Sequence, residues 1–135
     1  MENCSANTHL KQNGLKVTKQ RQILLQAIID SEKVFSAVSL HNKVKESMDF
    51  VTIYRILKVF LDNNIIREIV SNDTTRFYEL SCEHNPVHPH FVCKKCNSIL
   101  CLEAINNKNI SNLKKTAKDN SIEYIQFSGT CKNCK

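Results

Sequence analysis

Four cysteines in two evenly spaced pairs are the residues of this sequence most suited to metal chemistry. Cys93 and Cys96 stand in CKKC, and Cys131 and Cys134 stand in CKNC. Two residues between cysteines let both thiolates of a turn reach one metal ion, and two such turns complete a tetrahedral shell of four sulfurs. Because a closed shell leaves no position for a substrate or a reactive water, the pattern predicts a structural zinc site.

A second set of candidate ligands flanks the first cysteine pair. His88 and His90 are two positions apart, so their side chains leave a strand on the same face. Cys82 precedes these histidines, and Cys101 follows on the next predicted strand. Any one of them alone is more often a surface histidine or a buried thiol than a ligand. Together they predict a second metal site, with further candidate ligands at Glu79 and His84.

Catalytic uses of such residues have requirements that this sequence does not meet. A zinc deaminase carries a His-x-Glu motif upstream of its cysteine pair, and the chain has no such motif. A thiol oxidoreductase has one CxxC pair at a strand–helix junction, whereas this chain has two matched pairs. We therefore expect no enzyme and no small organic substrate. A constitutive zinc-ribbon adaptor that binds protein stays open as an alternative.

Length and composition describe a small globular protein. The chain has 135 residues, of which 41% are hydrophobic and 24% charged, so it forms one domain or two small ones. No run approaches the roughly 18 apolar residues of a membrane span, and MENCSANTHLKQNG has no signal-peptide core. We expect a cytoplasmic protein without a membrane partner. In that reducing compartment cysteines bind metals more often than they form disulfides.

Positive charge favours a polyanionic partner. The formal net charge is +6, and a basic surface attracts nucleic acid. The segment from Lys11 to Arg21 has no acidic residue and carries four of the basic residues: Lys11, Lys16, Lys19 and Arg21.

The first 80 residues show the pattern of a winged helix, with three or four helices followed by a hairpin. Helical periodicity and capping residues predict helices over Thr18–Glu32, from Ser36 onward, and over Asp49–Asn64. The apolar positions of the second of these are Val38, Leu40 and Val44. Two β-prone runs, 65–71 and 75–81, flank the turn signal NDT.

The remainder of the chain is predicted to form a smaller α/β domain. Both prolines, Pro86 and Pro89, fall in a segment over 81–89 that is typical of a linker. We therefore divide the chain into a DNA-binding domain over 1–80, a linker or hinge over 81–89, and a zinc-stapled domain over 90–135. The elements expected after the linker are strands over His90–Val92, Ile99–Leu102 and Ile122–Phe127 and a helix over Ser111–Asp119.

The third predicted helix has the composition of a DNA-recognition helix. Its apolar stripe comprises Ile53, Ile56, Leu57 and Phe60, spaced for burial. The opposite side carries Thr52, Arg55 and Lys58, with Tyr54 beside them. Arginine can read guanine bidentately, and the other side chains can hold phosphates. An ordinary amphipathic helix with a solvated face is the alternative, but the basic segment before it and the hairpin after it favour DNA binding.

These motifs together resemble the ferric uptake regulator family of bacterial metalloregulators. The similarity rests on TIYRILKVF, RFYEL, HPHFVCKKC and the terminal CKNC, and covers the chain from about Leu10 to Cys134. It implies an α+β fold: an N-terminal winged helix-turn-helix that binds DNA, followed by a small C-terminal α/β domain that forms a homodimer and carries a structural zinc site. In the family, metal between the domains locks the dimer in a DNA-binding shape. The resemblance places Thr52, Tyr54 and Arg55 at DNA, and the basic segment and the polar face of the helix add Lys16, Lys19, Arg21 and Lys58 as expected contacts.

Departures from the family pattern bear on which metal is sensed. Iron and peroxide sensors usually have a histidine before the third helix, where this chain reads KVFSAVS, and a carboxylate where Cys101 stands. Cys82 followed by His88 and His90 is similar to the zinc uptake regulator branch. Thiolate with imidazole suits zinc, whereas carboxylate with imidazole suits ferrous iron. We expect a zinc-sensing repressor that binds an inverted-repeat operator in double-stranded DNA, with an iron or peroxide sensor as the alternative.

Overall fold

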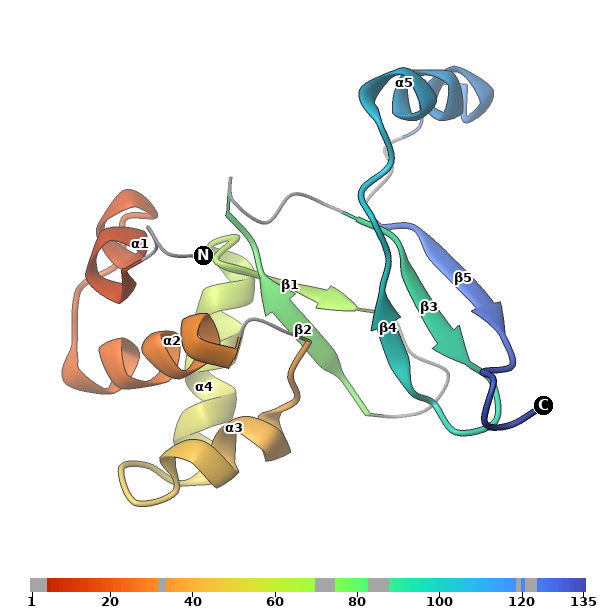
Figure 1. The fold of residues 1–135 in the computed structure, drawn as a ribbon. Coiled ribbons are helices and arrows are strands. Elements are labelled where there is room, and N and C mark those ends of the chain that lie inside the picture. Colours follow the sequence, from red (N-terminus) through yellow and green to blue (C-terminus); the bar gives the residue numbers. More distant parts are fainter. Residues whose placement is uncertain (1–4, 32–33, 70–74, 83–87, 119, 121–123) are drawn as a thin grey trace. The chain divides into compact units, whose positions relative to one another are not determined.

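The structure is a computed structural model that describes the chain except residues 1–4, 32–33, 70–74, 83–87, 119 and 121–123. The described residues form two compact units (Figure 1), the first running from α1 to Cys82 and the second from His88 to the C-terminus. Cys4, His84 and the hairpin turn NDT lie outside the described residues, as does most of the predicted linker.

Four helices open the N-terminal unit: α1 (Ala6–Gln12), α2 (Lys19–Ser31), α3 (Ala37–Val44) and α4 (Phe50–Asp62). Each begins at a residue whose side-chain oxygen accepts a hydrogen bond from a backbone N–H of the first turn. The capping residues are Ser5, Thr18, Ser36 and Asp49. Such caps satisfy N–H groups that have no partner within the helix. The predicted starts of α2, α3 and α4 are thereby confirmed.

The core of this unit includes the apolar stripe predicted on α4. On α4 the buried residues are Ile53, Ile56, Leu57 and Phe60, as expected. On α3, however, Val38 is 56% exposed and Ala37 is buried in its place. The prediction of Val38 as a core position was wrong because Ser36 caps α3, which turns Ala37, Leu40 and Val44 inward together.

Two antiparallel strands, β1 (Ile66–Ile69) and β2 (Phe77–Leu80), form the wing. Arg67 and Glu79 are cross-strand partners in this hairpin, and their Nε and Oε1 atoms are 2.6 Å apart. Glu79 is buried, and burying its carboxylate is tolerable because the guanidinium lies beside it. An isolated bridge between Phe35 and Tyr78 joins the hairpin to the segment before α3.

The C-terminal unit contains a three-stranded sheet in the order β4–β3–β5 (Figure 1). The central strand β3 (His90–Cys93) pairs antiparallel with β4 (Ile99–Cys101) and parallel with β5 (Gln126–Gly129). The first two strands agree with the predicted positions. The last lies further along the chain than predicted, because its pairing places Phe127 opposite Phe91 and Gly129 opposite Cys93.

The fifth helix, α5 (Asn107–Thr116), begins four residues before the predicted start at Ser111. The side chain of Asn106 accepts a hydrogen bond from the Asn109 N–H, and asparagine caps helices about as well as serine. No residue of α5 is buried. Within the described residues, every helix is too short or too polar to cross a lipid bilayer.

Candidate metal centres

The four paired cysteines converge on one point of the C-terminal unit. Each offers a sulfur, and all four sulfurs lie within 4.8 Å of one another. Cys93 ends β3, Cys96 closes the turn that follows it, and the other pair forms the last turn of the chain after β5. The parallel pairing of β3 with β5 places Cys93 opposite Gly129, which brings the second pair beside the first.

The spacing of the sulfurs fits zinc. A zinc–sulfur bond of about 2.3 Å in a tetrahedral shell separates the sulfurs by roughly 3.8 Å. The Sγ atoms of Cys96 and Cys131 are 3.8 Å apart. None of the six described cysteines forms a disulfide. The four-cysteine cluster is therefore typical of a structural zinc site.

Backbone N–H groups surround the sulfur of Cys93. Three of them, from Lys95, Cys96 and Cys131, lie 3.4 to 3.5 Å from Cys93 Sγ. These donors, with that of Cys131 contributing most, lower the pKa of Cys93 from 9.0 to about 6. Cys93 is therefore a thiolate near neutral pH, the protonation state that a metal requires.

Two other cysteines of the cluster differ in their pKa. Ser98, whose Oγ is 3.2 Å from Cys96 Sγ, lowers the pKa of Cys96. Hydrogen bonds to Cys131 and Cys96 raise the pKa of Cys134 to about 12, so this thiol must lose its proton to bind metal. The contribution of Ser98 was not anticipated, and its only sequence signal is a hydroxyl two residues after a ligand.

A second group of ligand atoms lies on the same sheet. His88, His90 and Cys101 each offer an atom within 4.8 Å of the others. His90 and Cys101 are cross-strand partners, and the rings of His88 and His90 have centroids 4.5 Å apart. His90 is only 3% exposed, His88 is half-buried and Cys101 is exposed. The group thus extends from the sheet interior to solvent.

Two other candidate ligands belong to the N-terminal unit. Cys82 follows β2 and packs, partly buried, against the core of that unit. Glu79 is in β2 and is paired with Arg67. Both stay predictions as metal ligands.

The outward side of α4 presents the expected DNA-contact residues. Tyr54, Arg55 and Lys58 are exposed, and Thr52 is half-buried beside the capping residue Asp49. The N–H and side chain of Thr52 lower the pKa of Asp49, so this carboxylate is charged at the start of the helix.

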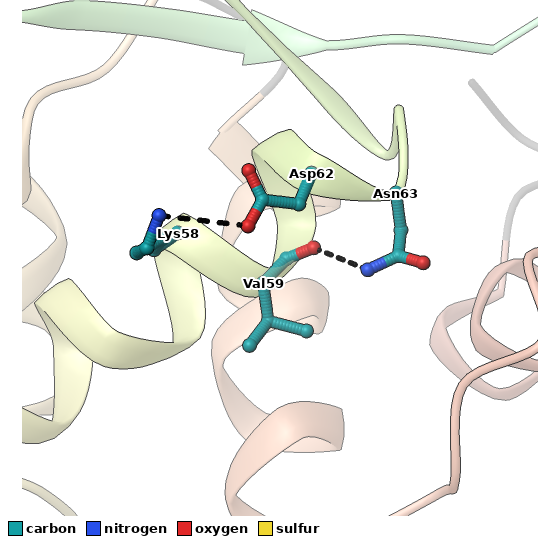
Figure 2. A network of polar contacts seen from close by, with 4 residues as sticks. All are labelled: Lys58, Val59, Asp62 and Asn63. Carbon is teal, nitrogen blue, oxygen red and sulfur yellow. Dashed lines mark hydrogen bonds and ion pairs between the residues drawn. The ribbon is translucent and has the colours of Figure 1, made fainter.

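The far end of α4 is held by two local contacts. Lys58 reaches the carboxylate of Asp62 at 3.6 Å, and the Asn63 side chain donates a hydrogen bond to the Val59 carbonyl (Figure 2). Both members of the Lys58–Asp62 pair are well exposed, so the pair contributes little to the stability of the helix.

The basic residues around the start of α2 differ in exposure. Lys16 and Lys19 are exposed. Arg21 is half-buried, and its Nη1 donates to the carbonyl of Lys16 at 2.9 Å. Arg21 therefore shapes the segment that carries Lys16.

Comparison with known protein families identifies the family of this chain. Residues 12–128 match the model of the ferric uptake regulator family. The chain belongs to this family of transcription regulators. Membership places it among regulators and not among enzymes.

Individual members of the ferric uptake regulator family resemble the chain closely. The ferric uptake regulation protein of Campylobacter jejuni is 31% identical over 99 residues, which cover 70% of this chain and 62% of the relative. The peroxide-responsive repressor PerR of Staphylococcus saprophyticus is 27% identical over 132 residues, covering 94% of this chain and 87% of that protein. The relatives thus include both an iron-uptake and a peroxide-responsive protein, so the family match leaves the sensed metal undecided.

A solved structure of the family confirms the fold class. The ferric uptake regulator of Vibrio cholerae superposes with a TM-score of 0.73 at 26% identity, covering 93% of this chain and 98% of that chain. The predicted α+β fold, an N-terminal helical DNA-binding domain followed by a C-terminal α/β domain with a four-cysteine cluster, is confirmed.

Proposed function

We propose that this chain is a cytoplasmic, zinc-responsive repressor that binds operator DNA as a homodimer. The observation that carries the proposal is a second donor group, separate from the four-cysteine cluster, in a chain that also has a winged helix. A closed shell of four cysteines has no free position, whereas His88, His90 and Cys101 supply three donors, one fewer than a tetrahedral zinc site takes. The first site suits a permanent ion and the second an exchangeable one.

Donor chemistry favours zinc as the regulatory ion. Two imidazoles and a thiolate are ligands that zinc accepts readily, while ferrous iron and manganese favour more oxygen donors. We propose Cys82 as the fourth ligand, with Glu79 as an oxygen alternative. Regulation by iron or peroxide would fit a site completed by that carboxylate, and it is the second candidate.

Chain order suggests how such an ion could act. Cys82 follows the wing, and the two histidines open the C-terminal unit, so one ion bound by both segments would tie the domains together. A ligand shifts a conformational equilibrium only through its differential affinity for the two states, and such coupling is typically about 1–3 kcal/mol. Zinc at this site would favour the arrangement of domains that binds DNA.

Two apolar surfaces of the C-terminal unit support a homodimer. Phe91 has Leu100 and Phe127 as cross-strand partners, and this row lies on one face of the sheet. Leu100 and Phe127 are each more than half exposed. A groove of about 780 Å³ under α5 is lined by apolar side chains that include Ile105, Ile110, Leu113 and Tyr124. Exposed apolar surface of this kind marks an interface.

The operator should be an inverted repeat. A two-fold dimer presents two recognition helices about 34–36 Å apart, one turn of DNA. We expect the zinc-loaded protein to select such a sequence from a random DNA library, and to lose affinity for it when the exchangeable zinc is chelated. Selection independent of added metal would instead support a constitutive DNA-binding protein, and no DNA selection at all would support the zinc-ribbon adaptor.

Two substitutions separate base reading from phosphate contact. Arg55→Ala should weaken binding to the selected duplex by about 1–3 kcal/mol and relax its sequence preference. Lys16→Ala should weaken selected and random DNA alike and flatten the salt dependence. Filter-binding or fluorescence titration at several salt concentrations measures both. An equal loss on both DNAs for Arg55→Ala would make Arg55 a phosphate contact.

A further inference from the structure

Three aromatic rings form a column across the turn between α3 and α4. His41 of α3 stacks on Phe50, with ring centroids 3.9 Å apart and planes inclined by 22°. Phe50, the first residue of α4, in turn stacks with Tyr54 one helical turn later, at 6.3 Å and 26°. The aromatic column, as we name His41, Phe50 and Tyr54, ends on the side of α4 that carries Arg55.

The exposure of these rings is unusual for a helix-turn-helix core. His41 is half-buried, Phe50 is 37% exposed and Tyr54 is 54% exposed. The hydrophobic core of the unit contains none of the three. Packing in the hydrophobic core therefore does not explain why these three rings stack. All three lie at the surface, next to the outward side of α4.

Ring stacking restricts how Tyr54 can move. An exposed tyrosine on a helix samples more than one χ1 rotamer, and a side chain ordered only on binding loses that freedom at a cost in affinity. Phe50, four residues earlier, faces Tyr54 because residues at i and i+4 are neighbours on a helix. His41 covers Phe50 in turn, so it limits the movement of the ring that contacts Tyr54.

We propose that His41 is a positioning residue for DNA binding, acting through Phe50 to hold Tyr54 in its DNA-contacting orientation. This inference rests on the proposed function, because it assigns a role in recognising DNA. The aromatic column also joins α3 to α4 through surface side chains, in addition to the hydrophobic core that the two helices share.

The direct test is a double-mutant cycle between His41 and Tyr54 in the full-length, zinc-loaded protein. His41→Ala should weaken binding to the duplex selected by the parent protein by about two- to tenfold, the range expected for one aromatic stack. In a Tyr54→Ala background, His41→Ala should cause no further loss, because coupled residues are not additive. His41→Phe keeps a flat ring and should restore parental affinity.

Other roles for His41 give other results. A direct contact between its imidazole and a phosphate would make the two losses additive, and His41→Phe would not rescue it; either result overturns the proposal. Asn42→Ala, a change at the exposed neighbour on α3, is the matched control and should bind like the parent. Thermal unfolding of every variant checks that the fold is retained.

A measurement without DNA separates this inference from the proposed function. Fluorine-labelled tyrosine gives three resonances, for Tyr54, Tyr78 and Tyr124, and Tyr54→Phe assigns the first. His41→Ala should shift and narrow the Tyr54 resonance while the other two stay in place. If the parent protein binds no DNA, the proposed function fails while this result still tests the column. An unchanged Tyr54 resonance overturns the column as a positioning device.

Discussion

The two candidate metal sites of the C-terminal unit are built in different ways from the same sheet. The four-cysteine cluster takes its ligands from two tight turns, and each turn supplies two sulfurs by local spacing alone. The second group takes His90 from β3, His88 from two residues before that strand, and Cys101 from the neighbouring strand. Strand pairing brings ligands together in both sites, but in the cluster it has only to place two ready-made turns side by side, whereas in the second group it selects an individual ligand, Cys101.

Electrostatics sharpen this difference. In the cluster, three backbone N–H groups hold the pKa of Cys93 at about 6, which prepares a thiolate before any metal arrives. Both sites mix buried and exposed donors, with Cys93 and His90 inside and Cys96 and Cys101 at the surface. The cluster supplies four sulfurs that close a tetrahedral shell, whereas the second group supplies three donors, so loss of each site should have different consequences.

The largest effect is expected for Cys96→Ser. Structural zinc sites contribute about 10–16 kcal/mol in small peptides, which exceeds the roughly 5–15 kcal/mol that stabilises a whole domain. We expect the variant to lose its tightly held zinc, to unfold its C-terminal unit and to become monomeric. Metal analysis after mild chelation, circular dichroism and sedimentation measure these three outcomes.

Cys101→Ser is the matched control for that change. It removes a thiol from the same unit without touching the cluster, and it should keep one chelation-resistant zinc per chain. A folded, dimeric Cys96→Ser protein without zinc would show that the cluster is not the staple.

An intermediate effect is expected for His90→Ala. The variant should stay folded and retain the zinc of the cluster, yet no longer gain DNA affinity when zinc is added, a loss of about 1–3 kcal/mol of coupling. Titration of the selected duplex with and without zinc measures this. Because His90 is buried, His88→Ala, at a half-buried position, provides a second variant should the first unfold. Parental zinc responses in both would place the sensor elsewhere.

The smallest effect is expected at Cys101. Removal of one exposed donor by Cys101→Ser should weaken the zinc response without abolishing it, because the two histidines remain. Cys101→Glu should shift the response toward ferrous iron, since carboxylate with imidazole suits that ion. Parallel DNA titrations with zinc and with iron under anaerobic conditions compare the variants. An unaltered zinc response in Cys101→Ser would remove this residue from the site.

Much of the fold was accessible from local sequence signals. Ser36 and Asp49 were predictable as helix starts, and the spacing of Ile53, Ile56, Leu57 and Phe60 predicted which side of α4 is buried. At two other places the local sequence pattern predicts the wrong residue. Val38 is apolar but faces solvent, and α5 starts after the asparagine cap Asn106 and not at Ser111. Local patterns alone do not rank such alternatives.

The sequence by itself determined the two cysteine pairs and the outward face of α4, because both depend on spacing within one turn or one helix. Only the tertiary structure decided which residues meet across elements. Strand register brings Cys101 opposite His90, and helix packing brings His41 of α3 onto Phe50 of α4. Such pairs are separated along the chain, and a register shift of one residue would turn every side chain of a strand to the other face.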